Sequence, residues 1–409
     1  MRRLLTLTAL SAAMLLTAGG TASGAWTVRT VPTSADATLL ALDAAPDGRI
    51  ATLYTDDDAL TLRVGATSTV LEREIDDSID VDLGHDAQGR FTVAWTLPRT
   101  GVVVWTEGRR EELQMPQEVV LELSLAVAPD GSAAVASSGY AGQWVARRTG
   151  GEAPFTATVE IDSRPGDETK AAITRDGEAV IAWEREGGFS VTRALAGAAF
   201  PRAQRIRVQG KELTGLQVTH AGLVVLSGRS LVAREDGGSD RRSVLATWPR
   251  SGTPSAIRVL SPAGRDGSPT QALARGSGVL VAWRDVPHGR GETAPARAAR
   301  LGLGVVDASG ALRTRRVTTG AGSGGVRSGP TAIAERGDAG ATVVLQGGPR
   351  NESLTAFGFD AALQPTHVQQ VNRRDDPADD ALAAQTGRGR PVVAYSASGG
   401  RIRLASPRA

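Results

Sequence analysis

The 409-residue sequence contains no cysteine, which excludes both a disulfide framework and any metal site built on thiolates. Only 4% of the residues are aromatic, and only two are lysines, at positions 170 and 211. Long apolar runs are also missing after the run from Leu4 to Ala18, so no membrane insertion is predicted for the rest of the chain. A chain of this kind must be stabilised by the packing of aliphatic and small side chains.

The N-terminus has the three parts of a secretory signal peptide. Met1-Arg2-Arg3 is basic, the run from Leu4 to Ala18 is apolar and uncharged, and small residues follow as far as Ala25. This pattern predicts a cleaved leader over residues 1–25 and a secreted protein, located in the extracellular space or the cell envelope. A retained membrane anchor is the alternative, but the run is short for a spanning helix.

An excess of one charge is absent from the mature chain. The whole sequence has 46 Lys and Arg against 44 Asp and Glu, and two of the arginines belong to the leader. Residues 26–409 are therefore formally neutral, so no nucleic-acid partner is predicted. The abundance of Ala, Gly and Arg is typical of a GC-rich bacterial coding bias.

A short motif recurs through residues 26–409. It consists of an apolar strand, a turn that ends in Gly, and a second apolar strand that often ends in an aromatic residue. The turn glycines lie at positions 48, 89, 131, 177, 222, 278, 340 and 389, with spacings of 41 to 62 residues. Such spacings are typical of propeller blades. The repeat predicts an all-β fold, a single β-propeller of eight four-stranded blades over residues 26–409; seven blades, with one irregular copy misread, is the alternative.

The two ends of the mature chain complement each other. The last copy ends after residues 401–404 and lacks an outermost strand, whereas Trp26 to Val31 reads as a strand without a blade of its own. Pairing these segments would close the ring and leave no open edge. The aromatic residues that end the second strands, as in Ala94-Trp95, are expected to pack between adjacent blades.

The turn Asp176-Gly177 and the strand end Ala182-Trp183 carry a resemblance to exported bacterial propellers, loosely grouped with sialidase-like and WD40-like repeat proteins. The resemblance is one of architecture and implies no activity. A sialidase would need a tyrosine nucleophile, but Tyr54 and Tyr395 occupy the packing position at the strand end, and the serine-containing Asp turn of that family is absent.

One chemical feature repeats in register. Nine residues before four of the turn glycines, where the innermost strand begins, the sequence has an acidic residue: Asp80, Glu122, Glu168 and Asp380. Neighbouring positions add Asp77, Asp167, Glu212, Asp266 and Asp379. Strand starts converge on one rim of a propeller channel, so we expect a partly acidic ring that attracts a cation, an amine or a basic peptide. Such oxygen ligands would suit Ca²⁺; the alternative is that these acids are simply solvated.

The four histidines, at positions 85, 220, 288 and 367, lie in different copies, and we interpret them as surface residues rather than metal ligands. No catalytic residue is assigned. Together the patterns predict a secreted, monomeric, non-catalytic binding protein that holds a protein, peptide or glycan on one propeller face. The alternative is an extracellular glycan-active hydrolase or lyase with its site at the axial channel, and a structural scaffold is a third possibility.

Overall fold

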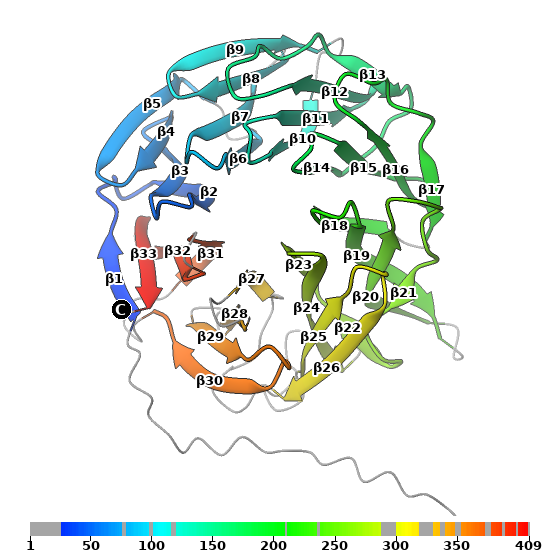
Figure 1. Ribbon diagram of the computed structural model, residues 1–409. Coiled ribbons are helices and arrows are strands. Elements are labelled where there is room, and N and C mark those ends of the chain that lie inside the picture. Colours follow the sequence, from blue (N-terminus) through cyan, green and yellow to red (C-terminus); the bar gives the residue numbers. More distant parts are fainter. Residues whose placement is uncertain are drawn as a thin grey trace, which may run out of the picture.

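A computed structural model of the chain shows a ring of β-sheets arranged around a central axis (Figure 1). It describes residues 26–75, 79–97, 101–115, 120–208, 211–234, 238–287, 300–318, 330–335, 340–347, 353–372, 378–386, 389–397 and 400–407. The predicted leader, Asp77 and His288 lie outside these residues, as do the side chains of Asp379 and Asp380. Within the described ranges, no helix has the length and apolarity that crossing a membrane requires.

Eight antiparallel sheets follow one another around the ring, seven formed by consecutive strands and the eighth by the last three strands together with the N-terminal strand. From the axis outward, the first four blades contain β2 (Thr38–Ala44), β3 (Ile50–Asp56), β4 (Ala59–Val64) and β5 (Thr67–Arg73); β6 (Val81–His85), β7 (Phe91–Leu97), β8 (Gly101–Thr106) and β9 (Arg109–Gln114); β10 (Val120–Val127), β11 (Ala133–Gly139), β12 (Gly142–Arg148) and β13 (Val159–Asp162); and β14 (Thr169–Ile173), β15 (Ala179–Arg185), β16 (Gly188–Ala194) and β17 (Gln204–Arg207).

The other four blades complete the ring. They contain β18 (Lys211–Val218), β19 (Val224–Ala233), β20 (Ser239–Trp248) and β21 (Arg258–Val259); β22 (Arg265–Gly267), β23 (Gln271–Arg275), β24 (Gly278–Pro287), β25 (Arg300–Val306) and β26 (Leu312–Thr318); β27 (Pro330–Glu335), β28 (Ala341–Gly347), β29 (Ser353–Phe359) and β30 (Pro365–Gln370); and β31 (Ala378–Gln385), β32 (Pro391–Ala397), β33 (Arg401–Pro407) and β1 (Trp26–Thr30).

The sixth blade differs from the predicted four strands because its innermost strand is divided. Both β22 and β23 pair with β24, which gives this sheet five strands. Pro269 lies between the two pieces and has no N–H to donate, so the ladder is interrupted there.

The predicted closure of the ring by the N-terminal strand is confirmed. β1 pairs antiparallel with β33, with Trp26 opposite Pro407 and Thr30 opposite Arg403. Trp26 is 9% exposed and packs in the same core cluster as Tyr395. The eighth blade is thus built from β1 near the N-terminus and from the last three strands, and the count is eight blades rather than seven.

Positive backbone dihedrals explain the recurrent glycine. In six blades the turn glycine has a φ between +68° and +93°, and its N–H donates to the carbonyl three residues earlier: Gly48, Gly89, Gly131, Gly177, Gly222 and Gly389. Side-chain-bearing residues rarely adopt this conformation. In the sixth blade the prediction of Gly278 as the turn glycine is wrong. There Gly276 has the positive φ of +53°, and Gly278 is already the first residue of β24.

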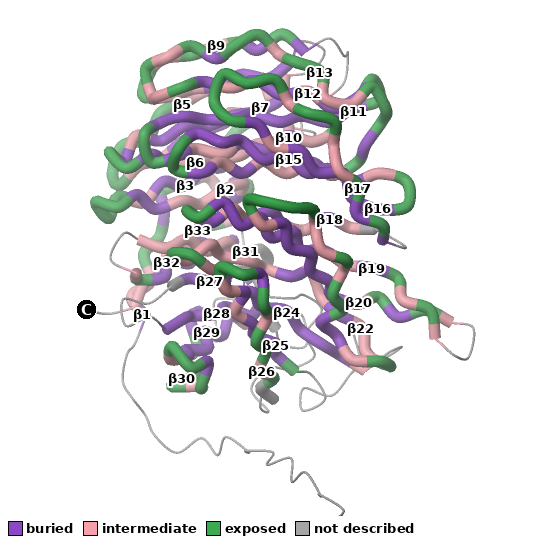
Figure 2. The backbone as a smooth tube through the Cα atoms, turned by 45° about the vertical axis from the view of Figure 1, so that its right-hand side comes forward, coloured by how far each residue is buried: buried purple, intermediate pink, exposed green. Residues whose placement is uncertain are grey.

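The aromatic residues that end the second strands pack against the preceding blade, as expected. Trp95 is fully buried in a cluster with Leu53 of the first blade, and Trp283 packs with Leu245 of the fifth blade in the same way. Figure 2 shows buried residues along the strands inside the ring, and exposed ones on outer strands such as β9 and β30. Packing between blades therefore supplies the core that disulfides do not.

Candidate functional site

The innermost strands form the wall around the propeller axis. Each of them contacts the innermost strand of the next blade, and β31 contacts β2, so the ring of strands is complete (Figure 1). We call the end where these strands begin the entry mouth, which carries Asp80, Glu122 and Glu168. The opposite end, where they finish in the glycine turns, is the turn mouth, which carries Asp43 and His85.

An acidic cluster lies at the entry mouth across the second to fourth blades. It contains three carboxylates and one ammonium group: Asp80, Glu122, Glu168 and Lys170. Lys170 Nζ donates a hydrogen bond to a Glu168 oxygen at 2.8 Å. The side chain of Glu122, on the strand between the other two acids, forms no hydrogen bond or ion pair with any residue that the structure describes.

Burial and the neighbouring charges shift the pKa values of the titratable groups in this entry-mouth cluster. Burial, followed by the charges of Glu168 and Asp80, raises the pKa of Glu122 to about 7. Burial also raises the pKa of Asp80, against the opposing effects of the Leu123 hydrogen bond and the Lys170 charge. For Lys170, the hydrogen bond and charge of Glu168 outweigh the effect of burial and raise the pKa. Glu122 is therefore partly protonated near neutral pH.

Part of the predicted acidic ring has a structural role. A carboxylate oxygen of Asp80 accepts the Leu123 N–H of the next blade at 2.5 Å, and Asp82 accepts the Leu125 N–H at 2.7 Å. Glu184 likewise accepts the N–H of Leu213. These bonds satisfy backbone donors between neighbouring blades that no ladder reaches. An acid near the start of an innermost strand can thus hold two blades together.

The other described residues of the predicted ring have partners of their own. Glu212 forms an ion pair with Arg229, and Asp266 accepts the N–H of Arg241. Asp167 accepts a hydrogen bond from Ser138 through its backbone carbonyl. Asp379 and Asp380 lie at the start of β31, which is the entry-mouth end of this strand, but their side chains are outside the described residues. Within the described part of the chain the acids form an arc over three blades.

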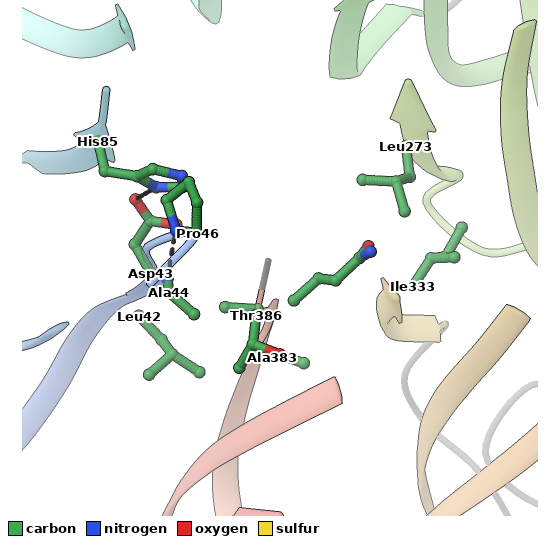
Figure 3. Close-up of a pocket in the computed structure, with 11 residues that line it drawn as sticks. Leu42, Asp43, Ala44, Pro46, His85, Leu273, Ile333, Ala383 and Thr386 are labelled. Atoms are coloured by element: carbon green, nitrogen blue, oxygen red, sulfur yellow. Dashed lines mark hydrogen bonds and ion pairs between the residues drawn. The ribbon is translucent and has the colours of Figure 1, made fainter. Parts of the chain in front are cut away.

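The turn mouth contains a cavity of about 380 Å³ (Figure 3). One wall carries the pair Asp43 and His85, and the opposite wall carries Leu273 and Ile333 (Figure 3). Strands of the first, second, sixth, seventh and eighth blades supply the lining, so the cavity lies on the axis. A concave site that is mostly apolar with a few polar groups is typical of a ligand pocket.

The Asp43–His85 pair was not predicted as a functional pair. His85 Nδ1 lies 2.7 Å from Asp43 Oδ2 across the first and second blades. Burial alone would lower the pKa of His85, but the hydrogen bond and charge of Asp43 outweigh it and raise the pKa. The sequence contains one sign of this pair: Asp43 and His85 precede their turn glycines by five and four residues, so both lie near the same end of their strands. Their contact depends on ring geometry.

The remaining described histidines are apart from both mouths' clusters. His220 is exposed in a glycine turn, and His367 lies on β30, opposite Gly358. Among the described residues, no group of three or more His, Asp or Glu is arranged to hold a metal ion. A calcium site stays a prediction.

No known protein-family profile matches the chain, and no curated protein matches it. Solved structures do match over nearly its whole length. One described as the Dos1 propeller is 14% identical, with a TM-score of 0.61, and the match covers 93% of this chain and 95% of that one. A streptogramin B lyase is 10% identical with a TM-score of 0.46, covering 94% and 98% of the two chains. The polysaccharide lyase Uly1 is 8% identical with a TM-score of 0.47, covering 93% and 91%. Such low identities show the fold alone, so the chain is similar in architecture to β-propellers without being assigned to one family.

Proposed function

We propose that this protein is an exported, non-catalytic binding protein, and that its axial channel holds a ligand with a cationic group and an apolar part. The observation that carries the proposal is the division of the channel wall. The second to fourth blades place Asp80, Glu122 and Glu168 at the entry mouth, whereas Leu273 and Ile333 of the sixth and seventh blades line the turn-mouth cavity. Clustered like charges attract a counter-charge, and the apolar wall favours burial of a hydrophobic group.

A basic peptide segment fits this division best. The innermost strands contain mostly five to eight residues, so an extended peptide of similar length would reach from one mouth to the other. A Lys or Arg side chain at the entry mouth would face Glu122, whose carboxylate has no described partner. An apolar neighbour on the same peptide would reach Leu273 and Ile333. Charge sets the orientation, and apolar burial adds affinity.

The tyrosines support a non-catalytic channel. Tyr54 and Tyr395 are 2% and 0% exposed, packed between blades, and Tyr140 is exposed at the β11–β12 hairpin. None of them lines the cavity at the turn mouth. A tyrosine nucleophile of the sialidase kind is therefore not placed where a channel substrate would react.

A glycan hydrolase or lyase is the second candidate, and one observation favours it. The Asp43–His85 pair holds an imidazole in a fixed orientation at the cavity wall, which is the arrangement a general base requires. This reading predicts turnover of a glycan that is lost in His85→Gln. Binding without turnover, unaffected by that substitution, would favour the first candidate.

The binding proposal is tested with the purified chain from residue 26 to 409. We would screen an array of Lys- and Arg-containing peptides with apolar neighbours, together with the matching peptides in which the basic residue is Gln, and a glycan array. Retained peptides should depend on the basic residue and on Glu122, so Glu122→Gln should weaken binding. Glu186→Gln, which removes an equal charge from an exposed hairpin, is the control. Equal binding of the basic and Gln peptides would contradict the proposal.

Export is proposed from the leader pattern and has its own test. The N-terminal sequence of the protein recovered outside the cytoplasm should begin at Trp26. Recovery of the full chain in the cytoplasm or the membrane would contradict export by a cleaved leader.

A further inference from the structure

A second concave site lies away from the axis, between the outer strands of the third and fourth blades. It has a volume of about 220 Å³ and is lined by Ile161, Asp162, Arg164, Arg185, Ser190, Arg202, Ala203 and Arg205. Four of these residues are arginines and one is an acid, so the lining has a formal charge of +3. We call this site the arginine pocket. Its residues belong to neither mouth of the channel.

Asp162 fixes the floor of the arginine pocket. Its side chain is 7% exposed and accepts a hydrogen bond from Nε1 of the buried Trp183 at 3.3 Å. Arg164 Nε donates to the same carboxylate at 2.9 Å, and Arg185 approaches it at 3.4 Å. One carboxylate thus positions two guanidinium groups but neutralises the charge of only one.

The other two arginines of the arginine pocket leave charge available. Arg205 donates to the backbone carbonyl of Glu186, and that carbonyl is an uncharged acceptor, although the Glu186 carboxylate acts on the neighbouring Arg185. Arg202 is exposed, and its guanidinium makes no hydrogen bond or ion pair with any residue in the described ranges. The Arg185 side chain is 18% exposed, and burial, followed by the charges of Arg164 and Arg205, lowers its pKa against the opposing charges of Asp162 and Glu186. Cations held this close together repel one another unless an anion joins them.

We infer that the arginine pocket binds a tetrahedral oxyanion, a sulfate or phosphate group, either free or as an ester. Guanidinium groups present planar pairs of N–H donors that match the spacing of oxygens on such groups. The lining charge of +3 exceeds what a single carboxylate would balance. The cavity holds more than a bare anion, so the group can arrive as the free ion or as an ester on a small molecule such as a sugar. This site is independent of the channel proposed above.

The test is calorimetric titration of the chain from residue 26 to 409 with sodium sulfate and sodium phosphate, in chloride buffer at constant ionic strength. We expect saturable binding with a dissociation constant on the order of 1 mM or tighter. Arg202→Gln and Arg185→Gln should each weaken it by roughly tenfold or more, because each removes a charge-assisted donor. Arg207→Gln is the matched control, since it removes the same charge from the next outward-facing position of β17 and does not line the pocket. It should change the affinity by less than about twofold.

A second arm separates the sources of the oxyanion. The affinities of galactose 6-sulfate, inorganic sulfate and galactose are compared. Tighter binding of galactose 6-sulfate than of inorganic sulfate, with no binding of galactose, indicates an esterified ligand. Equal affinities of galactose 6-sulfate and inorganic sulfate indicate the free ion. Arg202 is exposed, so its substitution leaves folding intact, and an unchanged melting temperature checks this. Absence of saturable sulfate and phosphate binding, or equal affinity of Arg202→Gln and Arg207→Gln, would overturn the inference.

Discussion

Glu122 makes the stability of this protein depend on pH in a direction opposite to that of a salt-bridged carboxylate. Its pKa is raised from the ordinary value of 4.5 to about 7, first by burial and then by the charges of Glu168 and Asp80. Because the folded pKa exceeds the unfolded one, the folded state holds the proton more tightly. The contribution of Glu122 to the free energy of unfolding is fully present below about pH 4.5 and is lost as the pH rises through about 7. Asp82, whose pKa burial raises from 3.8 to about 6, acts in the same direction.

The perturbation that tests this reasoning is Glu122→Gln, which removes the charge and keeps the shape. The full pKa shift corresponds to ~3 kcal/mol, and since the Glu122 side chain is partly exposed, solvent screening reduces the expected gain to ~1.5 kcal/mol at pH 8. For a chain of this length the unfolding entropy is about 0.8 kcal/mol per kelvin, so the melting temperature should rise by about 2 °C at pH 8. At pH 4.5 the wild-type carboxyl is largely protonated, and the difference should nearly vanish.

The assay is thermal unfolding followed by circular dichroism, from pH 4.5 to 8.5, on the wild type and two variants. Glu186→Gln is the control because it removes an acid from an exposed hairpin on the same propeller face. It should give a small difference without the rise between pH 5 and 8. A lower melting temperature for Glu122→Gln at pH 8, or an equal difference at pH 4.5 and pH 8, would refute the reasoning.

Three further predictions concern the ring itself. Gly302→Ala should destabilise by about 1–3 kcal/mol, because its Cβ would lie 2.1 Å from the ring of the buried Trp283; an unchanged melting temperature would mean that the indole can move aside. Asp80→Ala should destabilise by about 1–3 kcal/mol by leaving the Leu123 N–H without an acceptor, whereas Asp80→Asn should cost less because its amide oxygen can still accept; equal losses in chemical denaturation would contradict this role. Removal of β1 (Trp26–Thr30) should expose the edge of β33 and produce dimers or aggregates in light scattering, and the added peptide should restore the monomer; a stable monomer without the peptide would show that closure is dispensable.

The blade count and the closure could be predicted because they depend on local and periodic features. A turn glycine such as Gly177 needs a positive φ, and apolar strands recur on both sides of it, so each blade is encoded within one stretch of sequence. The spare strand at Trp26 and the missing strand after the last copy could be matched from chain order alone. The turn of the sixth blade was misplaced, because the segment Gly276-Ser277-Gly278 offers two glycines for one turn. The divided innermost strand of that blade was not predicted, because the spacing of turn glycines does not show the interruption at Pro269.

The candidate site could be predicted only in part. Residue spacing placed Asp80, Glu122 and Glu168 at one mouth of the channel, because equivalent positions in a repeat lie at the same height along the axis. The spacing did not show that Asp80 accepts a backbone hydrogen bond while Glu122 has no described partner. That difference depends on how far each carboxylate reaches toward the next blade.

The sequence by itself determined the repeat, since each blade is encoded by residues close together in the chain, and the order of the strands then indicated how the ring closes. The tertiary structure decided which side chains meet. Asp43 and His85 are 42 residues apart, and Arg164 and Arg205 come from different blades, yet each pair shares a cavity. Such neighbours come together because adjacent blades are packed side by side, and that packing is fixed by aromatic residues buried between blades, such as Trp95 and Trp283.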